Sequence, residues 1–309
     1  MNTPLTDDTK AVILLCGVLG KDRAPKPLSQ TEYNGLARWL NSRKMRPEDL
    51  LHASNAHLAA TSTGIEEDRL QDLLARGVQL GFAVEEWQRN GIWVISRSDR
   101  DYPERCKRHL RTQSPPLIFG VGDRTGLHGG GLAIVGSRRV DAEGTSFARE
   151  AARLTVQHGM PVVSGGARGV DENAMTAALD AGGTAIGVLA DNLLKRSLDR
   201  HGRHAIAEGR LLLLSPYHPN AHFTVGAAMG RNKLIYAMAD YGLVVSAEHK
   251  KGGTWAGAME ELKREDSLPV FVRTGTDVPL GNRRLLAAGA LAWTGEWPPY
   301  AQAQTSLIG

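Results

Sequence analysis

From residue 116 onward, short apolar segments alternate with stretches of helical periodicity, and this alternation constrains the fold more than any other feature. Apolar segments bounded by glycine, proline and polar residues are typical of buried strands. We expect strands at 132–135, 161–163, 184–189, 211–214, 243–246 and 270–272. After the first of these, Phe147, Ala151 and Leu154 share one helix face, and Gly159 ends the helix. The pattern predicts an α/β fold with a doubly wound, mostly parallel, Rossmann-like sheet.

The first third of the chain has a different pattern, in which apolar residues recur at helical spacing. Leu36 and Leu40 form one such pair, and Leu70, Leu73 and Leu74 form another group. Charged residues are concentrated in the next stretch, just before two adjacent prolines. We therefore expect a small all-helical domain at 1–90, a charged junction at 91–115, a Rossmann-like domain at 116–296 and a tail at 297–309.

The composition is that of a folded, soluble protein, with 42% hydrophobic and 23% charged residues among 309. The apolar run at 11–19 is shorter than the ~18 residues of a membrane span, and Asp7 and Asp8 precede it where a signal peptide carries positive charge. We expect a cytoplasmic protein without a membrane segment. Cys16 and Cys106 show neither disulfide nor zinc spacing and are expected to be structural, so no metal site is predicted.

The charge balance is mildly basic, with a net charge of +4. Arginine outnumbers lysine 27 to 10, and the arginine fork suits phosphate oxygens better than a lysine ammonium does. A GC-rich genome accounts for the arginine excess equally well. An anionic partner is therefore compatible with the charge but is not demonstrated by it.

Two glycine-rich segments follow the first two expected strands. Gly136-Ser137-Arg138 comes after the first, and Ser164-Gly165-Gly166-Ala167-Arg168-Gly169 comes after the second. Ligands bind at the carboxyl ends of such strands, where helix N-termini attract anions. We predict one phosphate-binding surface here. The alternatives are that the glycines serve only tight turns and close helix packing, and that Arg138 is a surface ion-pair partner.

Two later clusters extend this prediction. Arg231-Asn232-Lys233 groups cationic donors, and Gly252-Gly253-Thr254 lies at the start of an expected helix. A solvated helix face and a simple turn with an N-cap are the alternative readings. Asp171 is interpreted first as the N-cap of its helix rather than as a catalytic group.

Several motifs that would indicate other chemistry do not occur. The sequence contains no G-x-x-x-x-G-K-[ST], H-E-x-x-H or G-x-S-x-G motif, and Gly120-Val121-Gly122 does not complete G-x-G-x-x-G. No cofactor is therefore expected, and nucleotide-driven or hydride chemistry is disfavoured.

Taken in order, the segments of the second region resemble the DprA/Smf DNA-processing protein family. The elements that carry the resemblance are Tyr102-Pro103, Pro115-Pro116, residues 133–138, residues 164–171, Arg231-Asn232-Lys233, and Gly281-Asn282 leading to Gly289-Ala290. They span roughly residues 100 to 295. The family's small SAM-like helical domain also fits the region before residue 90.

The resemblance implies a homodimeric protein that protects single-stranded DNA in homologous recombination and DNA uptake, and that helps to load the RecA recombinase. It implies no catalytic residue. The phosphate-contacting residues would be Gly136, Ser137, Arg138, Ser164, Gly165, Gly166, Arg168, Gly169, Arg231, Asn232, Lys233, Gly252, Gly253 and Thr254. Binding of this kind is strongly salt-dependent and has little base specificity.

The sequence departs from the family pattern in places. Met175 stands where the family has histidine, Lys233 replaces an arginine, and Lys251-Gly252-Gly253-Thr254 replaces a Ser-Gly-Ser/Ala element. About twenty residues follow Ala290, so a C-terminal winged-helix domain is not expected.

Two further functions remain open from the sequence. The Gly252-Gly253-Thr254 segment is similar to an element of the cytokinin-activating phosphoribohydrolases, in which Glu260 would assist glycosidic cleavage of a nucleoside 5′-monophosphate. The alternative for Glu260 is an exposed helix carboxylate beside Glu261. A nucleotide sensor that binds a small phosphorylated signal without hydrolysing it would use the same loops.

Overall fold

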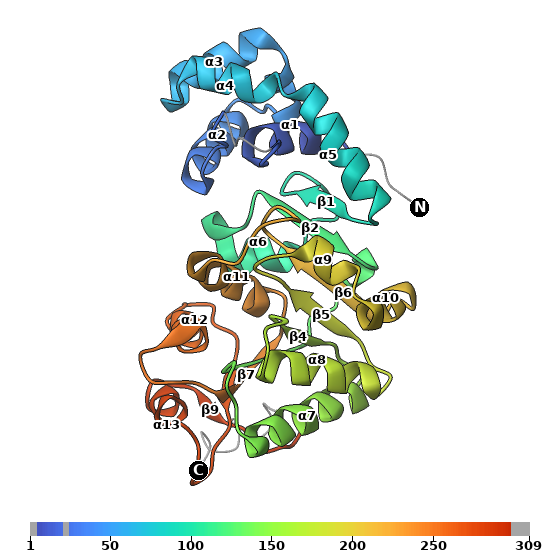
Figure 1. Cartoon of the computed structure of the whole chain (residues 1–309). Coiled ribbons are helices and arrows are strands. Elements are labelled where there is room, and N and C mark those ends of the chain that lie inside the picture. Colours follow the sequence, from blue (N-terminus) through green and yellow to red (C-terminus); the bar gives the residue numbers. More distant parts are fainter. Residues whose placement is uncertain (1–4, 21–24, 298–309) are drawn as a thin grey trace.

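One nine-stranded sheet runs through the C-terminal two thirds of the protein, and the N-terminal helices are stacked on one end of it (Figure 1). The computed structural model describes residues 5–20 and 25–297. The strand order is β1-β2-β6-β5-β4-β3-β7-β8-β9. The strands are β1 (Trp93–Ser96), β2 (Leu117–Val121), β3 (Leu132–Gly136), β4 (Val162–Ser164), β5 (Ala185–Val188), β6 (Leu211–Ser215), β7 (Tyr241–Ser246), β8 (Val270–Val272) and β9 (Leu291–Ala292).

The sheet is mostly parallel, which confirms the predicted fold class. Among the strands of the described residues, only β1 with β2, and β2 with β6, pair in the antiparallel sense. All six expected strands form, with ends shifted by a few residues. The strands β1, β2 and β9 had not been expected: β1 lies inside the charged stretch 91–115, β9 has only two residues, and the five-residue β2 directly follows the two prolines.

Helices cover both faces of the sheet, because successive side chains of each buried strand point to opposite faces. In β3, Leu132 and Ile134 pack toward α7 (Ala142–Gln157) and α8 (Val170–Asp180). Ala133 and Val135 point to the opposite face. That face is covered by α6 (Glu104–Leu110), α11 (Val225–Ala237), α12 (Gly252–Leu262) and α13 (Leu280–Ala287). The helices α9 (Leu193–Ser197) and α10 (Arg200–Ala207) precede β6 (Figure 1).

The buried face of α7 differs in detail from the expected one. Small residues such as Ala148, Ala151 and Ala152 are fully buried, whereas Phe147 and Leu154 are half-buried at its edges. Alanines let α7 approach the sheet and α8 closely, so the larger side chains lie to the sides. The helix ends at Gln157, with Gly159 at positive φ just beyond it, as predicted.

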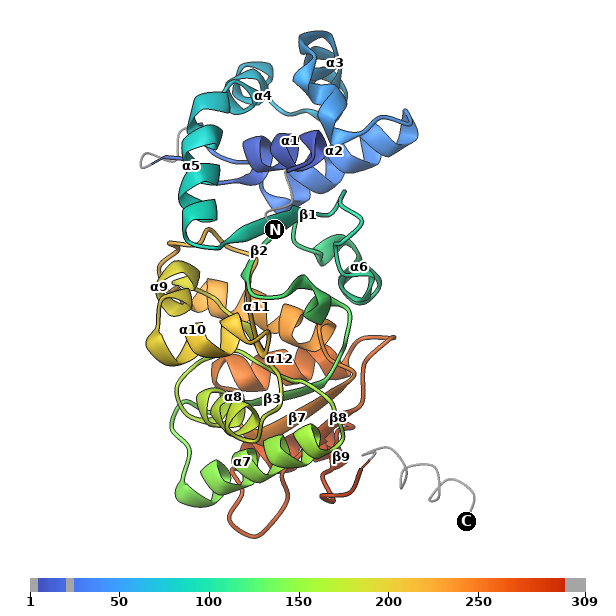
Figure 2. The ribbon, with the colours of Figure 1, turned by 90° about the vertical axis from the view of Figure 1, so that its right-hand side faces the viewer.

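The N-terminal region is helical and lies against β1 at one end of the sheet (Figure 2). The apolar run 11–15 lies in α1 (Asp7–Cys16) and is almost fully buried among the other helices. Leu117, Phe119 and Val121 of β2 belong to the same core. Among the described residues, no helix combines the length and apolar character that crossing a membrane requires. The remaining helices are α2 (Gln30–Ser42), η1 (Pro47–Leu51), α3 (Ala53–Thr63), α4 (Glu67–Leu74) and α5 (Gly77–Arg89).

The chain reverses its direction of progress across the sheet between β3 and β7. From β3 it proceeds through β4 and β5 to β6 on one side, and then α11 brings it back to place β7 on the other side of β3. The loops after β3 and β7 therefore diverge, and they leave a crevice at the carboxyl ends of the two strands. Of the predicted tail at 297–309, residues 298–309 lie outside the described residues.

Candidate functional site

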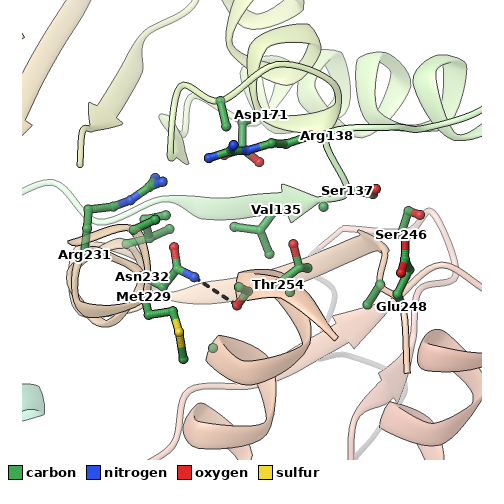
Figure 3. Close-up of a pocket in the computed structure, with 18 of the residues that line it drawn as sticks. Val135, Ser137, Arg138, Asp171, Met229, Arg231, Asn232, Ser246, Glu248 and Thr254 are labelled. Carbon is green, nitrogen blue, oxygen red and sulfur yellow. Dashed lines mark hydrogen bonds between the residues drawn. The ribbon is translucent and has the colours of Figure 1, made fainter. Parts of the chain in front are cut away.

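A cavity of about 360 Å³ opens at this crevice between β3 and β7 (Figure 3). The backbone N–H of Ser137, after β3, donates to the carbonyl of Ser246 at the end of β7, at 2.9 Å. Of the predicted residues, those that line the cavity are Gly136, Ser137, Arg138, Arg231, Asn232, Gly252, Gly253 and Thr254. Three of the four predicted segments therefore meet in one place, and the fourth, residues 164–169, adds Ala167 to the lining.

The first two glycine segments interlock. A Cβ on Gly136 would lie 2.4 Å from Val170 Cγ2, and a Cβ on Gly169 would lie 2.5 Å from the carbonyl oxygen of Ser137. The N–H of Val170 donates to that same carbonyl at 3.3 Å. Close packing thus explains these two glycines, and it fixes the loop that carries Arg138.

Other residues of the second segment are placed away from the cavity. The Ser164 hydroxyl is buried and donates to the Ile134 carbonyl at 2.6 Å, which ties β4 to β3. Gly166, at positive φ, lines a separate cavity and accepts a hydrogen bond from Arg196. Arg168 is exposed and does not line the cavity.

Ala167 is the residue of the second segment that lines the cavity, and Gly165 packs against two charged side chains of the cavity wall. A Cβ on Gly165 would lie 1.6 Å from Nη1 of Arg231 and 2.6 Å from Oδ2 of Asp171. Only glycine leaves room for these two charged side chains behind the cavity wall.

Arg231 is a buried residue of α11, not a surface donor. It is 5% exposed, and its Nη1 donates to the Val188 carbonyl at 2.8 Å. Its Nε and the hydroxyl of Tyr236, which also lines the cavity, are buried without a hydrogen-bond partner among the described residues. Burial lowers the pKa of Arg231. Two unpaired polar groups in a cavity wall indicate a site built to receive polar atoms of a ligand.

Asp171 is likewise buried against this cavity, and its predicted role as an N-cap is wrong. The N-cap of α8 is Gly169, and Asp171 is the second residue of the helix. Burial raises the pKa of its carboxyl to about 6, although Arg231 and the N–H groups of Ala167, Gly136 and Gly165 act in the opposite direction. The sequence pattern of a helix start gave no signal that the side chain turns inward.

Arg138 lies on the open side of the cavity. Its guanidinium carbon is 4.6 Å from the ring centroid of Phe223, and it has no carboxylate partner among the residues of known placement. The alternative of a surface ion pair is therefore not what the structure contains. Phe223 is 43% exposed, and Val225 and Met229 on α11 are also exposed beside it. Together they form an apolar rim next to an uncompensated positive charge.

The N-terminus of α12 closes the opposite side. No side chain caps this helix, so the first-turn N–H groups at Gly252, Gly253 and Thr254 are left to other partners. The Asn232 side chain donates from Nδ2 to the Gly253 carbonyl at 2.9 Å and fixes the turn against α11 (Figure 3). A helix N-terminus in this position favours an anion.

Lys233, in contrast, is turned away from the cavity. Its Nζ lies 3.0 Å from Oε1 of Glu260 and 3.3 Å from Oε1 of Gln113. Glu260 is also near Arg264, at 3.8 Å, and does not line the cavity. The pair Lys233–Glu260 thus braces α11 against α12.

Sequence reasoning missed the aromatic and charged rim of the site. Phe223 lies in the loop before α11, and Glu248 and Lys251 form an ion pair of 3.2 Å in the loop after β7. Leaving that pair aside, the cavity is lined by Arg138 and Arg231 against Asp171, which gives a net positive charge. An aromatic residue in a loop just before a helix, here Phe223, was the one signal in the sequence that could have pointed to this rim.

Comparison with known proteins agrees with this arrangement. The family model described as DNA recombination-mediator protein A matches residues 93–296. The Smf protein of Synechocystis sp. is 30% identical over 226 residues, covering 66% of this chain and 56% of that protein. The Smf protein of Escherichia coli is 31% identical over 162 residues, covering 51% and 43%. This chain thus spans about half the length of these two relatives. The DNA processing protein DprA of Bacillus subtilis is 28% identical over 229 residues, covering 68% and 71%.

Two solved structures share the fold. DNA processing protein A of Streptococcus pneumoniae superposes with a TM-score of 0.74 at 19% identity, covering 97% of this chain and 98% of that one. The Helicobacter pylori protein, whose structure describes a single-stranded DNA binding mode, has a TM-score of 0.54 at 24% identity, with 70% and 96% covered. Because the family model matches about two thirds of the sequence, the chain belongs to the DNA recombination-mediator protein A family, the DprA/Smf family of DNA-processing proteins.

Proposed function

We propose that this protein binds single-stranded DNA at the cavity between β3 and β7. The observation that carries the proposal is the pairing of Arg138 with Phe223, an unpaired guanidinium over an exposed ring at the mouth of an anion-attracting cavity. Guanidinium groups bind phosphates, and aromatic rings stack with bases of any sequence.

The inner wall of the cavity also carries groups that attract phosphate. The first-turn N–H groups of α12 offer donors to a phosphate that enters the cavity, and the guanidinium of Arg231 in the wall adds a positive charge. A strand would thus place one phosphate inside and stack a base on Phe223 outside. The single-stranded DNA binding of the Helicobacter pylori relative supports the same ligand class.

We extend the proposal to protection of single strands in recombination and DNA uptake, to loading of RecA, and to a homodimer acting in the cytoplasm. Membership in the family supports these roles. RecA loading is tested by measuring strand exchange on DNA coated with single-strand-binding protein, and the oligomer by light scattering after gel filtration. No gain in strand exchange, or a monomer at micromolar concentration, would remove the respective role.

Hydrolysis of a nucleotide is the weaker candidate. Its carboxylate, Glu260, is occupied by Lys233 and lies outside the cavity. Binding of fluorescent oligo-dT over a salt series, beside an assay for free base released from AMP, separates the two functions. Salt-sensitive strand binding without base release is expected, whereas base release without strand binding would overturn the proposal.

A further inference from the structure

Another cavity, of about 540 Å³, lies where the N-terminal helices meet the sheet region. It opens between α2 and η1 on one side and two short segments on the other: residues 97–98 after β1, and residues 111–112 in η2 (Arg111–Gln113). None of its lining residues belongs to the cavity between β3 and β7.

This cavity has a strong excess of positive charge. Arg38, Arg46, Arg97 and Arg111 line it, against the single carboxylate of Asp8. Asp8 is 1% exposed and is already engaged by Arg46 and by the backbone N–H of Glu48, at 3.0 Å. Arg46 is further neutralised by Glu48, at 3.7 Å.

Two of the arginines remain without a carboxylate. Arg111 is paired with Asp266 outside the cavity. Within the described part of the chain, neither Arg38 nor Arg97 has an ion-pair partner: Arg38 donates from Nε to the Asn34 carbonyl at 3.3 Å, and Arg97 donates from Nη1 to Asn34 Oδ1 at 2.8 Å.

Arg97 is held in place rather than free in solvent. It is half-buried, its guanidinium carbon lies 4.7 Å from the ring centroid of the buried Tyr33, and its Nη1 also approaches the Ser114 carbonyl at 3.4 Å. A fixed, partly desolvated guanidinium with no counter-charge is costly unless an anion neutralises it. The geometry therefore favours an anionic ligand at this end of the cavity.

The rest of the lining is suited to a larger group than phosphate alone. Ala37, Leu40, Met45 and Pro47 supply apolar surface, and the amide of Asn41 is exposed and engaged in no described hydrogen bond. Sites for small ligands combine apolar walls with a few polar groups in this way, in volumes of about 300–1,000 Å³. We propose that this cavity is a second ligand site that binds a nucleotide, with its phosphate on Arg38 and Arg97 and its base against the apolar wall.

The nucleotide is either a free mononucleotide or the phosphorylated end of a DNA strand, because both present the same groups. Calorimetric titration of the whole protein with AMP, in an Arg138→Ala background that disables the first cavity, tests the free form. Anisotropy of oligo-dT with a 5′-phosphate against the same strand with a 5′-hydroxyl, in the same background, tests the strand end.

Two variants and one matched control locate the binding. Arg38→Ala removes an exposed side chain, and Arg97→Gln removes the charge but keeps a donor for Asn34. Arg43→Ala is the control, because Arg43 lies just after α2 with its guanidinium over Trp39 and outside the cavity.

We expect AMP, or the 5′-phosphorylated strand, to bind saturably and to lose affinity by about tenfold or more in Arg38→Ala and Arg97→Gln, but not in Arg43→Ala. If neither probe binds, or if both cavity variants bind as the background protein does, the second site is refuted. Since the background lacks Arg138, failure here leaves strand binding at the first cavity unaffected, and the two proposals are judged separately.

Discussion

The guanidinium of Arg138 lies 4.6 Å from the ring centroid of Phe223, so the loop after β3 and the segment before α11 present one charged and aromatic surface at the mouth of the cavity. Phe223→Ala is expected to weaken oligo-dT binding by about 1–3 kcal/mol, since stacking of one base is lost. Fluorescence anisotropy measures the effect. Phe223→Trp, which keeps a stacking face, should bind nearly as the wild type does, and equal loss in both variants would argue against stacking.

The closeness of Gly165 to Arg231 predicts that any side chain at this position displaces the buried guanidinium. Gly165→Ala is expected to lower the melting temperature and weaken strand binding, because a Cβ would lie 1.6 Å from Arg231 Nη1. Thermal unfolding followed by circular dichroism measures the first effect. Gly81→Ala in α5 is the control, because nothing lies within 4 Å of its Cβ position and a helical glycine gains about 0.5–1 kcal/mol on this change. Equal stability of the two variants would contradict the packing described.

The buried carboxyl of Asp171 predicts a pH dependence. Its pKa in the folded protein is raised from 3.8 to about 6, so the folded state binds more protons than the unfolded state between these values. Its contribution to stability is therefore present at low pH and is lost as pH rises toward 6. A phosphate entering the cavity favours the protonated carboxyl further, so oligo-dT binding should tighten as pH falls through about 6.

Asp171→Asn separates the effect of this carboxyl from that of the other ionisable groups of the protein. The variant should keep the affinity that the wild type has at low pH and lose the dependence attributed to Asp171. Anisotropy at a series of pH values, at constant ionic strength, measures both. An unchanged pH profile in Asp171→Asn would assign the dependence to other groups.

Asn282 connects a sequence motif to the floor of the site. It is fully buried, accepts from the Ala247 N–H at 2.9 Å, and donates to the carbonyls of Val245 and Arg273, each at 3.0 Å. Asn282→Ala should lower the free energy of unfolding by roughly 2–4 kcal/mol, since three buried backbone groups lose a partner. Urea denaturation measures it. The exposed Asn220→Ala serves as the control, and an equal, small effect in both would refute the structural role.

The sequence allowed the sheet to be predicted because buried parallel strands and alternating helices leave a strong pattern. The segments that form the site were also predictable, since Gly136, Arg138 and Gly253 follow strands or open helices. The orientation of individual side chains was not. Asp171 resembles an N-cap in sequence and turns inward, and Lys233 stands beside Arg231 yet points to Glu260. On a helix, neighbouring residues face different directions, and only the packing of α11 decides which one meets the cavity.

The central claim is tested most directly by oligo-dT anisotropy over a salt series with Arg138→Ala and Arg139→Ala. Both changes remove one positive charge from the same loop, but only Arg138 lines the cavity. The account predicts strand binding that weakens with salt, a loss of about 1–3 kcal/mol in Arg138→Ala with a shallower salt slope, and little change in Arg139→Ala. No strand binding by the wild type, or equal losses in the two variants, would contradict it.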